Sequence, residues 1–124
     1  MLQVTEELVA QTIADLQDCL PQEGVGLWSG QGDEVLHWRP LRNVAADPLT
    51  GYLVQPQEWL DALAETSASG LTPLALVHSH PTAAAVPSAR DLREWMYLEL
   101  WCVIVSFQDE QPVWQACQIK RTAP

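Results

Sequence analysis

Basic residues are scarce in this sequence: of 124 residues, 6 are Lys or Arg and 16 are Asp or Glu, so the formal net charge is −10. Proteins that bind nucleic acid or an anionic membrane surface contact phosphate groups through a basic surface, which this composition does not supply. We therefore expect neither nucleic acid nor a membrane as a partner. The acidic balance suits a partner with a positive face, although acidity alone mostly serves solubility.

Long apolar runs and paired cysteines are also missing. No stretch of the sequence is long enough to span a bilayer. The N-terminal region carries Glu6 and Glu7 and no basic flank, which argues against a secretory signal peptide. The three cysteines, Cys19, Cys102 and Cys117, form no C-x-x-C pair and each has an apolar neighbour, which predicts buried free thiols in a reducing compartment. We expect a soluble, cytoplasmic protein.

Three helices are predicted from apolar residues at helical spacing. The first follows a Thr5 N-cap and ends before Pro21, the second runs from Pro56 until residues 67–70, and the third runs from Ser88 to about residue 98. Their expected buried residues are Leu8, Val9, Ile13, Leu16 and Leu20 in the first helix, Trp59, Leu60 and Leu63 in the second, and Leu92, Trp95 and Leu98 in the third.

Five or six strands are predicted from short apolar or alternating runs that turn residues bound. They cover residues 24–28 and 34–39 (a hairpin around a turn at 29–33), a brief strand at 52–54, and residues 71–77, 101–107 and 113–119. Residues 40–50 are expected to form an irregular loop. At this length we expect one domain, residues 1–124, of α/β or α+β class: a mixed β-sheet flanked by about three helices.

One short string combines the residue types that bind metal. His78-Ser79-His80-Pro81 follows the apolar run 71–77, and six residues later comes Ser88-Ala89-Arg90-Asp91. Side chains two apart on a strand point to the same face, so both imidazoles can reach one point, and Asp91 falls in the first turn of the third helix. Two neutral imidazoles and one carboxylate are three of the four ligands of a tetrahedral zinc ion. A fourth position left for water is typical of a catalytic site.

Each part of this pattern also has a simpler explanation. A His-x-His pair at a strand end is more often satisfied by hydrogen bonds than by a metal. Ser88 and Asp91 fit a capping box, with Ser at the N-cap and an acid at the N3 position. Glu23, taken alone, is most simply a solvated acid in a turn. The small residues Gly24 and Gly26 after it would let another backbone, or a substrate, come close.

Taken together, H-S-H-P-x6-S-x2-D resembles the metal motif of the JAMM (MPN-plus) zinc metalloproteases, without insertion or gap. That family pattern also has an upstream glutamate, usually followed three residues later by glycine, as in Glu23-Gly24-Val25-Gly26. The short spacing between the histidines and the aspartate is similar to that of the compact prokaryotic members. The resemblance implies an MPN fold, which is cytidine-deaminase-like, and zinc held by His78, His80 and Asp91.

The resemblance also implies an activity. It assigns Glu23 as the general base and Ser88 as the hydrogen-bond donor to the oxyanion. The implied function is a zinc-dependent peptidase or isopeptidase that cleaves after the C-terminal Gly-Gly of a ubiquitin-like or sulfur-carrier protein, by Glu-assisted attack of zinc-bound water. The alternative is a non-catalytic MPN-type module that recognises a ubiquitin-like partner. A zinc nucleobase deaminase is disfavoured because its H-x-E and P-C-x-x-C pattern is absent.

Four further features near this motif carry expectations of their own. His37, inside the second strand, is left out of the site. The region of Asn43 is similar to a JAMM segment that lies beside the substrate tail, which makes Asn43 a candidate for substrate binding. Ser79 is expected to fix the loop between the two histidines. The loop at residues 82–87 has an alanine run and no polar anchor, so it is expected to be mobile until a substrate orders it.

Overall fold

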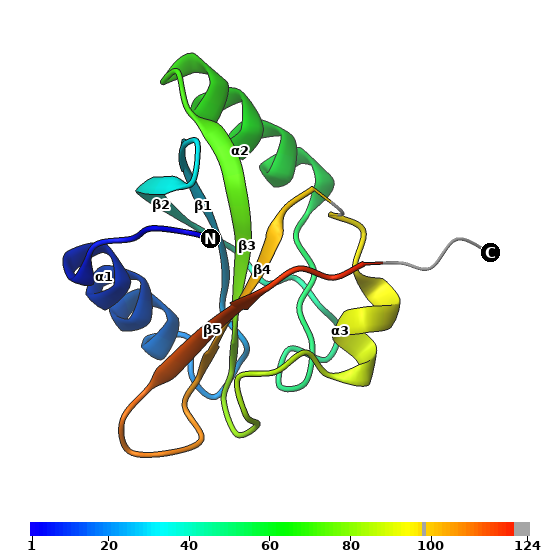
Figure 1. The fold of residues 1–124 in the computed structure, drawn as a ribbon. Coiled ribbons are helices and arrows are strands. Elements are labelled where there is room, and N and C mark those ends of the chain that lie inside the picture. Colours follow the sequence, from blue (N-terminus) through cyan, green and yellow to red (C-terminus); the bar gives the residue numbers. More distant parts are fainter. Residues whose placement is uncertain (98, 121–124) are drawn as a thin grey trace.

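A computed structural model describes residues 1–97 and 99–120, and in it five strands form one mixed sheet in the order β2-β1-β3-β4-β5 (Figure 1). The strands are β1 (Val25–Gln31), β2 (Glu34–Leu41), β3 (Thr72–His80), β4 (Trp101–Ser106) and β5 (Val113–Cys117). Neighbouring strands pair antiparallel except β3 and β4, which pair parallel. The expected mixed sheet is confirmed, and β3 occupies its centre.

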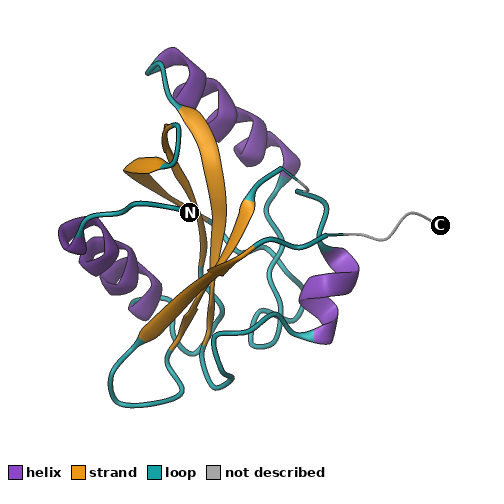
Figure 2. Ribbon diagram, in the orientation of Figure 1, coloured by secondary structure: helices purple, strands orange, loops and turns teal. Residues whose placement is uncertain are grey.

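Helices cover both faces of this sheet (Figure 2). One apolar cluster packs against α1 (Glu6–Gln17), and the other contains residues of α2 (Pro56–Ala68) and Trp95, which follows α3 (Ala89–Glu94). Side chains alternate along a strand, so Leu76 lies in the second cluster while Ala75 and Val77 lie in the first. The central strands are therefore buried on both faces, and this gives them their nearly continuous apolar sequence.

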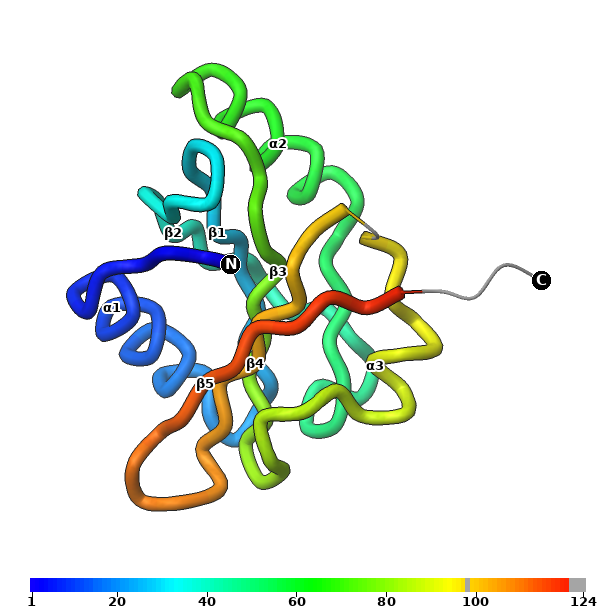
Figure 3. The backbone as a smooth tube through the Cα atoms, in the orientation of Figure 1, coloured from blue at the N-terminus to red at the C-terminus, as the bar shows by residue number. Residues whose placement is uncertain are grey.

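The path from β3 to β4 brings the third helix over the sheet. Figure 3 traces the chain from the end of β3 through a loop into α3 and back into β4. Parallel neighbours require such a crossover, since a tight hairpin would reverse the direction of the chain. The crossover starts where the two histidines of the motif end β3, so it carries Asp91 back towards them.

The predicted helices are present with adjusted lengths and faces. The Thr5 hydroxyl accepts the Leu8 N–H at 3.2 Å, which confirms the expected cap, and α2 begins at Pro56 as predicted. Leu20, Leu60 and Leu92 are 37%, 58% and 49% exposed, so their predicted burial is wrong. The helix α3 ends at Glu94 because Trp95 takes an extended conformation, which lets its indole enter the core. The prediction for Leu98 lies outside the described residues.

The first hairpin turns more tightly than predicted. Residues 29–31 belong to β1, which has a bulge between Ser29 and Gly30, and the turn is only Gly32 and Asp33. Gly32 supplies the positive φ of 58° that the turn needs. The glycines at the start of this hairpin make room for the core. A Cβ on Gly26 would stand 2.2 Å from the Trp38 ring, so the expected close approach is by an aromatic side chain and a neighbouring strand.

The structure also tests three smaller expectations. The predicted strand at 52–54 is absent from the described sheet, because this extended segment pairs with the Asn43 side chain rather than with a strand. All three cysteines are free as expected, but Cys19 is exposed and Cys117 is half-buried, so only Cys102 fulfils the predicted burial. Within residues 1–97 and 99–120, no helix has the length and apolarity that a membrane crossing needs.

Candidate metal centre

The two histidines of the motif lie at the end of β3 on the face that α2 and α3 cover. His78 is fully buried and His80 is 4% exposed. In the register of the sheet, His78 stands opposite Val25 of β1 and Ile104 of β4, so the strands on both sides hold it. The Nε2 atoms of the two rings lie 3.2 Å apart. The strand period thus brings both imidazoles to one point, as the spacing predicts.

Asp91 completes a triangle of ligand-type atoms. Its Oδ2 atom lies 3.2 Å from His78 Nε2 and 3.0 Å from His80 Nε2. The same oxygen accepts the Ser88 backbone N–H at 2.9 Å, and the Ser88 hydroxyl accepts the Asp91 N–H at 3.0 Å. These two bonds form the capping box that was the simpler explanation. The same Asp91 carboxylate therefore caps the helix and contacts the two histidines.

A loop carbonyl fixes the protonation of His80. Its Nδ1 atom lies 2.8 Å from the Ala84 carbonyl oxygen, which can only accept, so Nδ1 carries the hydrogen. The lone pair of a neutral His80 is then on Nε2, which faces His78 and Asp91. The loop itself is held, because the Ser106 hydroxyl donates to the Ala83 carbonyl at 2.6 Å. The expectation of an unanchored loop is wrong, since backbone carbonyls supply the anchors that its side chains lack.

Glu23 lies just before β1, beside the end of β3. Its N–H donates to the Pro48 carbonyl at 2.8 Å, and its carbonyl accepts from the Asn43 amide at 2.9 Å, so both backbone groups are fixed. Its side chain is 6% exposed, and among the described residues the Oε1 atom has no hydrogen-bond partner. A carboxylate oxygen of Glu23 and a ring nitrogen from each of His78 and His80 lie within 4.8 Å of one another. A buried acid therefore faces the same point as the histidines.

Burial and the shared carboxylate set the charges of the three central groups. Burial lowers the pKa of His78, which favours the neutral ring that a metal ion requires. Burial also opposes protonation of His80, but the hydrogen bonds to Asp91 and Ala84 outweigh it and raise its pKa. Burial alone would raise the pKa of Asp91, yet the hydrogen bonds with both histidines hold it well below its usual range. Asp91 is thus an anion between two imidazoles.

Glu23 behaves differently from Asp91. Burial raises its pKa to about 7, with the charge of His80 lowering it and the charge of Asp91 raising it. Two carboxyl groups that face one point therefore have well-separated pKa values. One is fixed as an anion, and the other can take or release a proton near neutral pH, which is the property of a general acid–base group.

This donor set fits a zinc ion. Ligand atoms about 2.0–2.1 Å from a tetrahedral zinc ion lie about 3.3 Å from one another. The three distances among His78 Nε2, His80 Nε2 and Asp91 Oδ2 are 3.2, 3.2 and 3.0 Å, close to the edges of such a tetrahedron. The Glu23 carboxyl, whose Oε1 atom has no hydrogen-bond partner among the described residues, lies beside this cluster without belonging to the triangle.

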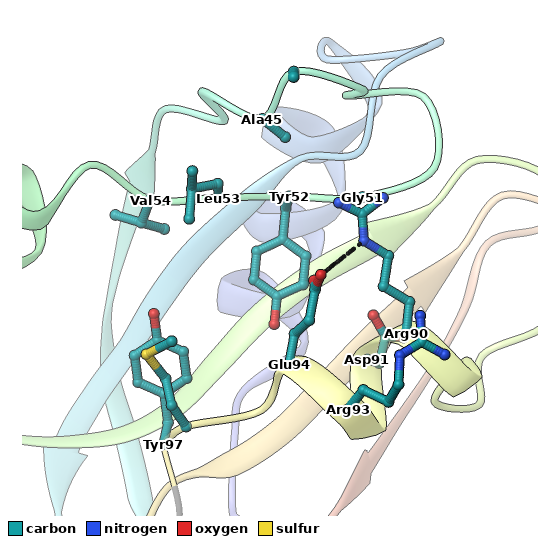
Figure 4. Close-up of a pocket in the computed structure, with 12 residues that line it drawn as sticks. Ala45, Gly51, Tyr52, Leu53, Val54, Arg90, Asp91, Arg93, Glu94 and Tyr97 are labelled. Atoms are coloured by element: carbon teal, nitrogen blue, oxygen red, sulfur yellow. Dashed lines mark hydrogen bonds and ion pairs between the residues drawn. The ribbon is translucent and has the colours of Figure 1, made fainter.

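Two hollows flank the candidate centre. The smaller, of about 140 Å³, is lined by Glu23, His80 and Ser88 together with residues 81–83. The larger, of about 580 Å³, lies between residues 45–54 and α3 (Figure 4). Asp91 lines the larger hollow, so the cluster stands where the two hollows approach each other. An extended chain placed through both would pass beside the cluster.

Other candidate residues have structural roles. The Asn43 side chain makes four hydrogen bonds, to the carbonyls of Glu23 and Gly51 and from the N–H groups of Ala45 and Leu53. Every donor and acceptor of this amide is therefore used. The Asn43 side chain shapes the larger hollow rather than facing a ligand. The Ser79 hydroxyl accepts the Gly24 N–H at 2.8 Å. It ties β3 to the residue after Glu23, whereas the expectation was a loop contact.

Sequence reasoning missed two residues beside the centre. The ring of Tyr52 stacks on His78, with ring centroids 4.5 Å apart, and burial raises the pKa of its phenol. The Arg90 guanidinium lies against Gly51, where an added Cβ would stand 2.5 Å from its Cζ atom. A glycine outside a turn is a sign of such a close approach, and Gly51 was the available signal. His37, which was left out of the site, is on β2 and exposed.

Comparison with known proteins identifies the family. The family described as prokaryotic homologs of the JAB domain matches residues 5–120. The match spans nearly all of the chain and includes every residue of the candidate centre. The chain belongs to the prokaryotic JAB branch of the JAMM/MPN family.

Curated relatives carry names that describe an activity. A probable TtuB-protein conjugate cleaving protease of Thermus thermophilus is 46% identical over 94 residues, which are 76% of this chain and 63% of the relative. A desampylase of Haloferax volcanii is 36% identical over 73 residues, 57% of this chain and 52% of the relative. The chain thus spans less than two thirds of the length of these relatives.

Solved structures share the fold. A Desulfitobacterium hafniense protein is 30% identical with a TM-score of 0.84, over 94% of this chain and 82% of its own. A JAB1/MPN domain protein of Archaeoglobus fulgidus is 20% identical with a TM-score of 0.63, over 94% and 89%. A structure described as JAMM, a metalloprotease-like zinc site in the proteasome and signalosome, is 19% identical with a TM-score of 0.61, over 97% and 89%. The expected MPN fold is confirmed.

Proposed function

We propose that this chain is a zinc-dependent peptidase or isopeptidase that cleaves after the C-terminal Gly-Gly of a ubiquitin-like or sulfur-carrier protein. The observation that carries the proposal is the triangle of His78, His80 and Asp91 ligand atoms, 3.0 to 3.2 Å apart, with a buried Glu23 carboxyl facing it. The names of the relatives, a conjugate-cleaving protease and a desampylase, support a hydrolase of protein conjugates.

In this proposal His78, His80 and Asp91 hold the zinc ion. Bound zinc supplies Lewis acidity, which polarises the scissile carbonyl and makes water acidic enough to react near neutral pH. The protein contributes the orientation of the ligands. Ala84 fixes the His80 tautomer, and the Ser88 N–H orients the Asp91 carboxylate, which are the outer contacts that metal sites in proteins commonly need.

Glu23 moves the proton. Its pKa of about 7 lets its carboxylate accept a proton from the attacking water and then, as the acid, deliver that proton to the leaving amine. Both backbone groups of Glu23 are hydrogen-bonded, so the backbone that carries this carboxyl is fixed beside the histidines.

Ser88 stabilises the developing negative charge. Its oxygen already accepts the Asp91 N–H, so the hydroxyl hydrogen remains available for donation. Ser88 lines the smaller hollow beside Glu23 and His80. A hydroxyl at that place can donate to the carbonyl oxygen as it becomes an oxyanion, and removing one such donor costs about 3 kcal/mol of transition-state stabilisation.

The larger hollow suits an extended tail that ends in two glycines. Residues 51–54 form one wall as an extended segment, and Asn43 holds them in place. Glycines pass a narrow gap beside Asp91 without a side-chain clash. An extended tail also offers its peptide groups for pairing with an extended wall.

The test uses fusions of a sulfur-carrier domain that ends in Gly-Gly and continues into a short peptide. Zinc-loaded protein should cut after Gly-Gly and leave a matched Val-Val fusion intact. The Glu23→Gln variant should retain zinc and capture the Gly-Gly fusion without cutting it. Equal cleavage of both fusions would refute the Gly-Gly specificity. Binding of the fusion by wild type with no cleavage would identify a recognition module instead.

Two broader expectations belong to the same proposal. Residues 1–124 act as one metallopeptidase domain, which the continuous five-stranded sheet supports. The protein works in the cytoplasm, which its three free cysteines support, because thiols persist in reducing compartments.

A further inference from the structure

Arg90 crosses the larger hollow at its end nearest the candidate centre. It precedes Asp91 on α3, and Figure 4 shows its side chain reaching from the helix to the wall at Gly51. Its Nε–H lies 3.1 and 3.3 Å from the two carboxylate oxygens of Glu94. A Cβ on Gly51 would stand 2.5 Å from both Cζ and Nη1 of Arg90. The guanidinium therefore packs against the bare backbone of a buried glycine.

The outer edge of this guanidinium is unused. Among the residues that the structure describes, Nη1 and Nη2 of Arg90 have no hydrogen-bond acceptor, since only Nε pairs with Glu94. The Arg90 charge is also among the influences that lower the pKa of Glu23. Unused N–H donors thus lie in the hollow, one residue along the chain from Asp91.

A simple ion pair does not explain this arrangement. Arg90 and Glu94 are spaced i, i+4 and partly exposed, and such surface pairs contribute little to stability. The pair needs no glycine opposite, whereas any side chain at position 51 would displace the guanidinium. Glu94 and Gly51 together fix where the guanidinium lies, at the wall of the larger hollow that both Arg90 and Gly51 line.

We propose that Arg90 is a substrate-binding residue that donates from its Nη groups to the peptide carbonyl between the last two residues of the tail, just before the scissile bond. This inference rests on the proposed function. When the scissile carbonyl lies at the metal cluster, the preceding peptide group lies in the larger hollow beside Arg90. A planar fork held by Glu94 loses little freedom when it binds a carbonyl, which favours Arg over Lys at this position.

The test measures binding of a labelled peptide that ends in Gly-Gly to zinc-loaded protein, without turnover. A charged hydrogen bond is worth enough that Arg90→Ala should weaken binding about tenfold or more. Arg90→Lys should recover only part of this loss. Gly51→Ala, which keeps the charge and moves the guanidinium, should weaken binding as well. Arg42→Ala is the matched control, because Arg42 is an exposed arginine that lines neither hollow, and binding to this variant should stay within about twofold of wild type.

A modified peptide identifies the contacted group. Replacing the carbonyl between the two glycines by a methylene should weaken binding to wild type and leave binding to Arg90→Ala nearly unchanged, as expected for two changes that remove one contact. Binding of Arg90→Ala within twofold of wild type, or equal losses in Arg90→Ala and Arg42→Ala, would overturn the role of Arg90 alone. Failure of wild type to bind any Gly-Gly peptide would overturn the substrate class, and this inference with it.

Discussion

The Nδ1–H of His80 donates to the carbonyl of Ala84 at 2.8 Å, four residues further along the chain. A loop of alanines thereby decides which nitrogen of a histidine keeps its lone pair. The same loop is tied to β4 by the Ser106 hydroxyl, so β3, the loop and β4 act on His80 as one rigid unit. The tautomer of His80 that the proposed zinc site requires is therefore set by the fold alone.

Zinc should stabilise this protein. Added to the zinc-free form at a free concentration one hundred times Kd, zinc should raise the unfolding free energy by about 2.7 kcal/mol, because it binds only the native state. His80→Ala should show neither bound zinc nor a rise in Tm. Elemental analysis and thermal melts measure both. Equal zinc content in His80→Ala and wild type would contradict the ligand assignment.

Ser88→Ala should separate the cap from the metal. The variant loses the bond from the Asp91 N–H, so it should lose about 1 kcal/mol of unfolding free energy, as N-cap replacements do. Its zinc content should remain at the wild-type level, because the ligand atom is untouched. Denaturant unfolding and elemental analysis test the two halves. Asp91→Asn is the comparison, and it should lose zinc as well as stability.

The zinc-free protein should show a pH dependence that belongs to Glu23. Its pKa is about 7 in the folded state and about 4.5 when exposed. Folding therefore favours its protonated form, and this stability, full below pH 4.5, is lost as the pH rises towards 7. The gap in Tm between Glu23→Gln and wild type should open across this window and then level off. A gap that is constant from pH 4 to 8 would contradict the raised pKa.

Asn43→Ala should loosen the wall of the larger hollow. The change leaves two carbonyls and two N–H groups without their partner, so we expect a loss of about 2 kcal/mol in unfolding free energy. Proteolysis should become faster between residues 44 and 53. Gln57→Ala is the matched control, since this exposed amide makes one bond to Asp61 and should cost less than about 0.5 kcal/mol. Similar losses in the two variants would refute the role of Asn43.

The parts of the site that sequence could predict are those that local rules govern. The two-residue period of a strand placed His78 and His80 on one face, and the N3 position of a cap placed Asp91 in the first helical turn. Both depend on neighbours within a few residues. The family resemblance then related Glu23 to these residues, although more than fifty positions separate them from it.

The parts that sequence could not predict depend on the path of one long loop. Tyr52 reaches His78, and Gly51 meets Arg90, only because Asn43 holds residues 51–53 against the site. No periodicity marks such a segment, and the sequence predicts a brief strand at residues 52–54 instead. The predicted end of α3, at about residue 98, is wrong for a similar reason. Trp95 fits a helical stripe, but its burial is reached from extended backbone after the helix has ended.

Because β3 pairs with a strand on each side, its register decides whether the proposed zinc ligands meet. It pairs with β1 on one side and β4 on the other, and a slip by one residue would turn His78 and His80 towards α1 and Ser79 towards α3. A chain in the wrong register would therefore keep neither histidine at the proposed zinc site. The zinc content per chain should therefore report the fraction of molecules in the native register, and an insertion within residues 72–80 should abolish zinc binding.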